Sequence, residues 1–371
     1  MDMGLNSSGL MGNIKSIPRI QKPMRLSIKL DSKKKFASYT KRVLIDGVEP
    51  QLNTPVATLD ENNRLLVPFS VAKSAAAKLN KTPEITSASL QGSMINKNGV
   101  QYVLLDSLKE MLGLSIENDR YGMTINLITS PNPDSKVDST NRLIRTTNLP
   151  KNSGSFPYIL QNVPNSMYEM TFPTSKNKNK KNSAQLWKND DSLSVFVTDE
   201  DVNEWARTVS TYYDLMLNVD YRTINYQWAD EVFPLLSGNY NETYMKGQIR
   251  SYVDWVKKNK IVMRGYAKPE PSIIYNPGGN NLYYIRTTFS YEILQANSSK
   301  YITPSPSAKI ITKPKKGIVG KYELYYDVPL TYPLWFSLNN DRKSIRAGNT
   351  ELMNIYYHSQ LFETPWEEVA G

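Results

Sequence analysis

The chain of 371 residues contains no cysteine and a single histidine, His358. Without cysteine it can form neither disulfides nor thiolate metal sites, and it has no cysteine nucleophile. A single histidine excludes a multi-histidine zinc site and nearly excludes a Ser-His-Asp triad. Because copper and zinc prefer thiolate and imidazole ligands, we expect no metal site, and nothing in the sequence indicates a cofactor.

Long hydrophobic runs are also missing. No stretch approaches the ~18 apolar residues of a membrane helix, so we expect no transmembrane segment. Met1–Pro18 is polar and lacks the apolar segment of a signal peptide. Since Met1–Gly4 is typical of a start joined to a mature sequence, we expect a signal peptide to have been removed. A hydrophobic fraction of 40% indicates a globular protein, long enough for two or three domains.

Acidic residues are the minority among charged residues, and the net charge is +10. Residues 1–42 hold ten Lys and Arg against two Asp, and Ser175–Asn182 is a second basic run. A basic segment favours an anionic partner such as a wall polymer, although a solvated arm or loop explains such runs as well. No nucleic-acid motif accompanies these runs, so we expect no specific nucleic acid. The residues predicted to contact an anionic surface are Lys33, Lys34, Lys35, Lys176, Lys178, Lys180 and Lys181.

Aromatic residues are scarce before residue 150, and all six tryptophans lie beyond it. Two domains of different origin explain this change better than one continuous core. The predicted organisation is a basic segment at 1–42, a small domain at 43–130, a linker rich in Pro, Lys and Asn with short strands at 131–192, and a second domain at 193–371.

The first domain contains a weak repeat of a strand followed by a helix. Asn63–Phe69 precedes an Ala-rich helix, and 36 residues later Gly99–Leu105 precedes a helix that Gly113 ends. The pattern of Asn63–Phe69, Val103–Gly113 and Asn118–Leu127 resembles the copper amine oxidase N-terminal-like domain, also called a stalk domain. The sequence departs from that family at Leu104, where proline is usual, and at Asn118-Asp119, where Trp-Asp is usual. The resemblance implies a secreted or wall-associated protein of a Gram-positive bacterium, and no copper ligands.

In the second domain, helical periodicity comes before strand periodicity. Apolar stripes predict helices near 199–216, 226–236 and 242–259, and alternation predicts strands at 283–293 and 321–328. Asn276–Asn280 is predicted to be a hairpin loop rather than a phosphate-binding loop. Helices followed by long antiparallel strands resemble the NTF2-like α+β roll, in which helices pack on a curved antiparallel sheet.

Three further groups of residues could carry chemistry. Asp199–Asp201 is far more typical of helix-start electrostatics than of a metal site, because consecutive helical residues diverge. A lone His358 is more often structural than catalytic. The cone of an NTF2-like fold often holds a ligand, although aromatic stripes are more often plain core. The predicted ligand-binding residues are Trp205, Trp228, Trp255, Tyr284 and Phe289.

The leading functional hypothesis is therefore a non-enzymatic, secreted or wall-associated binding or scaffold protein. Its partners would be an anionic wall polymer or surface proteins, and self-association stays open. One alternative is an enzyme or small-molecule binder with an aromatic pocket in the second domain. Another is a subunit of a surface or secretion assembly.

Overall fold

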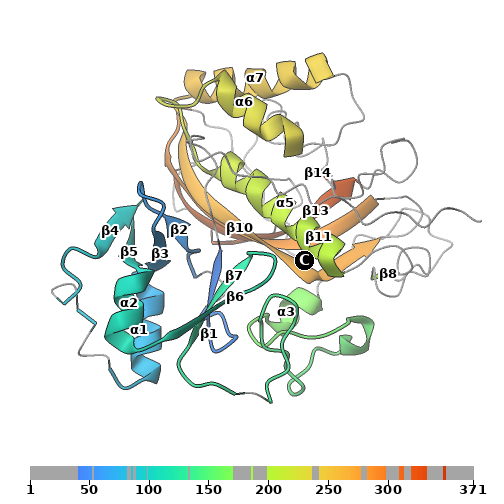
Figure 1. Cartoon of the computed structure of the whole chain (residues 1–371). Coiled ribbons are helices and arrows are strands. Elements are labelled where there is room, and N and C mark those ends of the chain that lie inside the picture. Colours follow the sequence, from blue (N-terminus) through green and yellow to red (C-terminus); the bar gives the residue numbers. More distant parts are fainter. Residues whose placement is uncertain are drawn as a thin grey trace, which may run out of the picture. The chain divides into compact units, whose positions relative to one another are not determined.

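The structure, a computed structural model, describes residues 41–51, 54–81, 85–86, 89–97, 99–132, 134–169, 185–186, 199–235, 242–276, 282–297, 309–312, 319–331 and 346–347. Every described residue belongs to one compact unit of the chain, within Lys35–Gly371. Helices and antiparallel sheets are combined in this unit, which confirms the α+β class (Figure 1).

Two strand–helix units lie in the first part of the described fold. The elements are β2 (Thr58–Leu59), β3 (Leu65–Pro68), α1 (Phe69–Lys78), β4 (Met94–Lys97), β5 (Val100–Leu104) and α2 (Leu105–Leu112). β3 runs directly into α1 and β5 directly into α2, which confirms the strand–helix repeat. The strands form an antiparallel sheet of order β2-β3-β5-β4. Gly113 caps α2 with the expected positive φ, 70°.

A second small sheet has the order β1-β7-β6, from β1 (Arg42–Ile45), β7 (Thr124–Ile128) and β6 (Ser115–Asn118). β1 pairs with β7 in parallel, and β6 pairs with β7 in antiparallel. Val43, Ile125 and Leu127 of this sheet join one buried cluster with α1 and α2. Burying apolar surface against both helices is what holds these short elements together, since none could bury a core alone.

The segment between the predicted domains carries little regular structure. Only a 3-10 turn, η2 (Ser153–Ser155), and a single helical turn, α3 (Asn165–Tyr168), are found in its described part up to residue 169. The sequence predicts short strands in this segment, one of them beginning at Met167, but Met167 and Tyr168 belong to the helical turn α3. Pro164 precedes this turn, and its fixed φ suits a helix start. Phe156, Leu160, Met167 and Tyr168 form a third buried cluster with β10, so the segment is packed where a linker was predicted.

A curled, half-barrel-like sheet dominates the rest (Figure 1). Its path is β12-β13-β11-β10-β8, with β14 beside β13 and β9 beside β10. The strands are β8 (Gln185–Leu186), β9 (Val219–Asp220), β10 (Val262–Asn276), β11 (Leu282–Gln295), β12 (Lys309–Thr312), β13 (Gly320–Thr331) and β14 (Arg346–Ala347). β10 and β11 pair in antiparallel on either side of 277–281, as the predicted hairpin requires. β11 and β13 confirm the two predicted strands, whereas β10 was not predicted from the sequence.

Helices fill the concave side of this sheet (Figure 1). They are α5 (Asp199–Leu217), α6 (Tyr226–Val232), the 3-10 turn η4 (Phe233–Leu235) and α7 (Glu242–Lys258). The predicted stripe of α5 is buried, as are Ile249, Tyr252, Val253 and Val256 of α7. This largest core explains why aromatic residues are concentrated beyond residue 150.

Candidate functional site

The candidate site begins with an irregularity in β10, at Lys268-Pro269-Glu270-Pro271-Ser272. Pro269 pairs with Thr287 and Ile274 with Ile285, so β10 has four residues between the two pairs where β11 has one. Neither proline can donate a hydrogen bond to the ladder, and such residues are found at bulges. The bulge therefore frees the Glu270 side chain from the regular pleat, although that side chain is buried.

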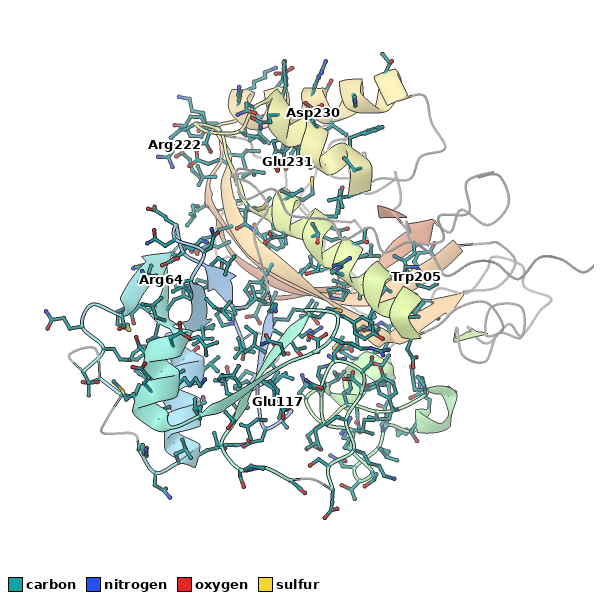
Figure 2. All side chains as sticks on the ribbon, in the orientation of Figure 1. Arg64, Glu117, Trp205, Arg222, Asp230 and Glu231 are labelled. Carbon is teal, nitrogen blue, oxygen red and sulfur yellow. The ribbon has the colours of Figure 1, made fainter. Side chains whose placement is uncertain are left out.

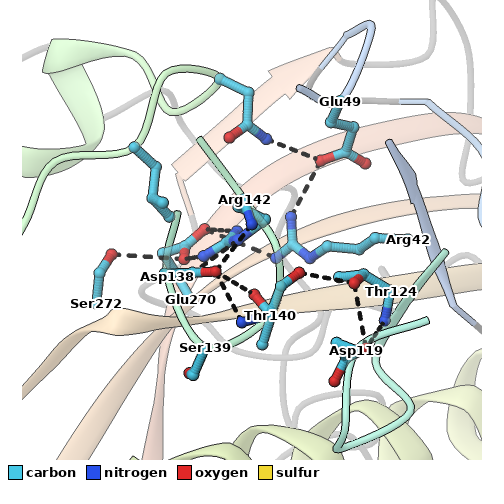
Figure 3. Close-up of polar contacts among 12 residues, drawn as sticks. Arg42, Glu49, Asp119, Thr124, Asp138, Ser139, Thr140, Arg142, Glu270 and Ser272 are labelled. Atoms are coloured by element: carbon cyan, nitrogen blue, oxygen red, sulfur yellow. Dashed lines mark hydrogen bonds and ion pairs between the residues drawn. The ribbon is translucent and has the colours of Figure 1, made fainter. Parts of the chain in front are cut away.

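Glu270 receives the guanidinium group of Arg142. Nη1 of Arg142 donates to Oε2 of Glu270 at 2.9 Å, and Nη2 donates to Oε1 (Figure 3). Asp138 holds the other edge of the same guanidinium, with Nε of Arg142 3.3 Å from Oδ2. Asp138 also accepts the backbone N–H groups of Thr140 and Arg142, at 2.8 and 3.0 Å. The hydrogen bonds within the turn at 138–142 thus hold the Arg142 side chain in the orientation in which it pairs with Glu270.

Glu49 lies at the centre of the second half of the cluster. Nη1 of Arg42 is 3.1 Å from Oε2 of Glu49, and the amide of Asn162 donates to the same oxygen at 3.2 Å (Figure 3). Nζ of Lys268 donates to Oε1 of Glu49 and to the carbonyl oxygen of Thr54. The two halves of the cluster are joined by Arg42, whose Nη2 is 3.7 Å from Glu270.

The cluster balances three basic against three acidic side chains: Arg42, Arg142 and Lys268 against Glu49, Asp138 and Glu270. Burial lowers the pKa of Lys268 to about 8, while the charge of Glu49 opposes that decrease. Burial alone would lower the pKa of Arg142, but Glu270 and Asp138 raise it well above its usual value. Pairing is what makes these charges tolerable inside the protein.

Side chains also protect the edge of β10 between its pairings with β9 and β8. Backbone carbonyl oxygens there would otherwise be available to a foreign strand. The amide of Asn218 donates to Gly265 at 2.7 Å, the hydroxyl of Ser210 to Ala267 at 3.4 Å, and Nη2 of Arg42 to Pro269 at 2.8 Å. The ionic cluster is therefore continuous with the protected edge of the half-barrel sheet.

A second buried ion pair holds α3 to the sheet. The guanidinium of Arg286 pairs with Asp327 through Nε and Nη2, at 2.8 and 2.9 Å. Nη1 of Arg286 donates to the carbonyl oxygen of Met167, which lies within the predicted linker. Tyr275 donates its hydroxyl to Asp327 at 2.7 Å. The alternation in β11 thus buries a polar face as well as an apolar one.

The predicted aromatic residues do not all lie together. Trp205, Trp228, Trp255 and Phe289 belong to the concave core, with Trp205 on α5 (Figure 2). Tyr284 packs against a different cluster and stacks on Tyr275, with ring centroids 5.7 Å apart. Whether the first four line a ligand cavity stays a prediction.

Two buried polar atoms in that core are relevant to such a cavity. Nε1 of Trp228 and the hydroxyl of Tyr252 have no hydrogen-bond partner among the residues that the structure describes. The two rings stack with centroids 5.4 Å apart. Burial raises the pKa of Tyr252 above its usual value, so its hydroxyl keeps its proton. The hydroxyl of Tyr252 and the indole N–H of Trp228 can therefore each donate a hydrogen bond.

Other predicted residues lie outside the described ranges. These are Lys33, Lys34, Lys35, Lys176, Lys178, Lys180, Lys181 and His358. Asp199 begins α5 as expected, while the side chains of Glu200 and Asp201 are not described. Within the described ranges, no group of three His, Cys, Asp or Glu residues is arranged to hold a metal ion. The same part of the chain has no helix long and apolar enough to cross a membrane.

The charged cluster was not predicted from the sequence, although one signal for it is present. The motif Asp-x-x-Asn-Arg-Leu occurs at 60–65 and again at 138–143. Both copies form the same turn: Asn63 and Asn141 have φ of 61° and 62°, and each Asp accepts the N–H and Nε of its Arg. The Arg64 side chain is 49% exposed, whereas that of Arg142 is 1% exposed. The motif predicts the turn, and only the fold decides which arginine is buried.

Comparison of the chain with protein-family models, with curated proteins and with solved structures found no match. The functional conclusion therefore rests on the residues and the geometry described above.

Proposed function

We propose that this chain is a non-enzymatic scaffold or binding protein of a bacterial cell surface or wall. In this proposal a stalk-type module of two strand–helix units is clamped to an NTF2-like α+β roll. The resemblance to the copper amine oxidase N-terminal-like domain supports the extracellular setting. The basic excess of the chain supports attachment to an anionic polymer.

The observation that carries the proposal is that the buried, paired charges come from three different segments of the chain. Arg42 comes from β1 and Glu49 from the loop that follows it, Arg142 from the segment after β7, and Lys268 and Glu270 from the half-barrel sheet. These charges face one another across the three segments. A catalytic site needs charged groups that can reach a substrate, whereas these are buried and paired. The cluster is thus suited to fixing modules in place.

Attachment can be tested by sedimentation of the full chain with purified Gram-positive cell walls. Lys33→Gln/Lys34→Gln/Lys35→Gln should weaken binding several-fold at low salt, and high salt should weaken binding of the parent chain as well, because counter-ions screen charges over ~8 Å at physiological ionic strength. The matched control is Lys257→Gln/Lys258→Gln/Lys260→Gln, which removes the same charge from an exposed part of the structure. Deletion through residue 42 would be a poor test, since Arg42 belongs to the ionic cluster.

Equal, salt-insensitive sedimentation of all three proteins would contradict attachment through the basic segment. If both triple variants weakened binding equally, net charge alone would be responsible. In either case, a protein of the cell surface would be the better candidate for the scaffold's ligand than a polymer bound through the basic segment.

A small-molecule binder is the second candidate, favoured by the two buried donors Trp228 and Tyr252. A neutral ligand with acceptor atoms would satisfy both groups. Native mass spectrometry of the purified protein should then show an added mass that Trp228→Phe removes. A spectrum of the bare chain in both proteins would favour the scaffold.

A further inference from the structure

The small sheet of order β2-β3-β5-β4 has two edge strands that differ in how they are covered (Figure 1). Beside β2, the N–H of Ala57 donates to the carbonyl oxygen of Lys41 at 2.7 Å, and its own carbonyl oxygen accepts the N–H of Lys41 at 3.2 Å. The carbonyl oxygen of Leu59 in β2 accepts Nζ of Lys97 at 2.8 Å. The outer side of β2 is therefore occupied by other parts of the same chain.

The opposite edge strand, β4, directs backbone groups outward. Its ladder with β5 is antiparallel, and at its start the N–H of Leu104 donates to the carbonyl oxygen of Ser93 at 3.1 Å. Since bonded and non-bonded pairs alternate along such a ladder, Ile95 directs its N–H and C=O toward β5, whereas Met94 and Asn96 direct theirs away from it. Within the described part of the chain, no hydrogen bond from another element reaches the backbone of Met94 or Asn96.

β4 also lacks the features that protect exposed strand edges. Met94, Ile95 and Asn96 carry no charge, include no proline and pair with β5 without a bulge. Lys97 is the one charged residue of the strand, but its Nζ is bound to the hydroxyl of Thr58 and to Leu59 of β2. An uncharged, regular edge of this kind is suited to pairing with a further strand.

We propose that β4 is a self-association edge, at which two copies of the chain pair through antiparallel β4 strands. In a register centred on Ile95, Met94 of each copy lies opposite Asn96 of the other, and each of these pairs exchanges two backbone hydrogen bonds. Ile95 lies opposite Ile95 of the second copy as a closely spaced, non-bonded pair, with Cα atoms about 4.5 Å apart.

The edge fits a second copy because its sequence is compatible with itself in this register. Ile95 is half-buried in one copy, and pairing with its counterpart covers more of this β-branched side chain. Met94 and Asn96 are uncharged, so no like charges oppose each other across the two strands. Pairing continues one small sheet into the other and uses both open β4 edges, so the assembly closes as a dimer. This dimer does not depend on attachment to a wall polymer.

Sedimentation velocity of the full chain over a series of protein concentrations measures the dimer. Asn96→Pro removes the outward N–H and places a ring at the open edge, while the hydrogen bonds to β5 are kept. The association constant should fall about tenfold or more, because two of the hydrogen bonds across the interface are lost. Asn96→Ala is the matched control, since it changes the same side chain but keeps the N–H, and it should dimerise like the parent.

A single introduced cysteine gives a second measurement, because the chain contains no other cysteine. In the dimer of Ile95→Cys, Cα atoms about 4.5 Å apart are within the range that a disulfide spans. Oxidation with diamide should therefore give a covalent dimer on a non-reducing gel. Gln101→Cys is the control, because this exposed residue of β5 would lie three strand spacings, about 14 Å, from its counterpart and should cross-link far more slowly.

A parent chain that stays monomeric at every concentration would overturn the proposal. A dimer that Asn96→Pro leaves intact would also overturn it, because another surface would then hold the two copies together. If Asn96→Pro does not fold, the two cysteine variants decide the question. Faster cross-linking through position 95 supports pairing of the β4 edges, and equal rates for positions 95 and 101 refute it.

Discussion

At the scale of single residues, the same local sequence can place one arginine side chain at the surface and another in the interior. Arg64 and Arg142 occupy equivalent positions in two copies of one turn, and each is held by an aspartate four residues earlier. Only Arg142 meets a carboxylate from a distant part of the chain, Glu270. A buried ion pair is expensive to break from one side, because the remaining charge stays buried without a partner.

We therefore expect Arg142→Met to lower the free energy of unfolding by about 3–5 kcal/mol. Arg64→Met is the matched control and should cost less than about 1 kcal/mol, since exposed pairs contribute little. In a double-mutant cycle with Glu270→Met, the coupling energy should be about 1–3 kcal/mol. Urea denaturation followed by tryptophan fluorescence gives the free energy of unfolding of the four proteins in the cycle and of Arg64→Met. Additive effects of the two changes would show that Arg142 and Glu270 do not stabilise each other.

At the scale of elements, β10 is the most constrained strand. It combines a proline-containing bulge, a side-chain-protected edge and pairing with three other strands, β8, β9 and β11. Gly265 lies where the edge meets Asn218 and where β10 approaches β11 closely. A Cβ added to Gly265 would lie 2.4 Å from Cβ of Tyr291 and 2.6 Å from the carbonyl oxygen of Ser290. Neither atom belongs to a mobile side-chain end.

Gly265→Ala should therefore destabilise the protein by about 3 kcal/mol or more, because backbone of paired strands would have to move. Gly247 in α7 provides the contrast, since nothing lies within 4 Å of an added Cβ there. Gly247→Ala should raise the free energy of unfolding by about 0.5–1 kcal/mol, through the higher helix propensity of alanine. Thermal denaturation of both variants gives the comparison. An equal response at the two glycines would mean that β10 and β11 can separate without cost.

At the scale of the molecule, the described part of the chain has three buried apolar clusters joined by polar contacts. One cluster belongs to the strand–helix units, one to the half-barrel and its helices, and one to the intervening segment with β10. The sequence predicts that the domains holding the first two of these clusters, at 43–130 and 193–371, are independent folding units. The ionic cluster adds the expectation that they stay associated.

Limited proteolysis with trypsin tests both expectations. Cleavage is expected between Lys176 and Lys181, and it should give two protease-resistant fragments that co-elute in gel filtration. The same treatment of Arg142→Met/Glu270→Met should give fragments that separate, because part of the buried polar contact is lost. Resistance of the whole chain to cleavage would contradict independent folding. Separation of the parent fragments would contradict the clamp.

Local structure could be predicted from the sequence because its signals lie within a few residues. The stripe of α5, the helix stop at Gly113 and the alternation in β11 and β13 each depend on neighbours along the chain. The α+β class follows from their order. β10 was not predicted because Pro269 and Pro271 interrupt the alternation of apolar and polar residues. α3 was not predicted because a single helical turn has almost no periodic signal.

The sequence by itself determined which elements form, which faces are apolar and which metal chemistries are excluded. Only the tertiary structure decided which charges meet. Arg142 and Glu270 are 128 residues apart, and Arg42 and Pro269 are 227 residues apart. A turn motif fixes the geometry of an arginine, but its partner depends on which surface packs over it.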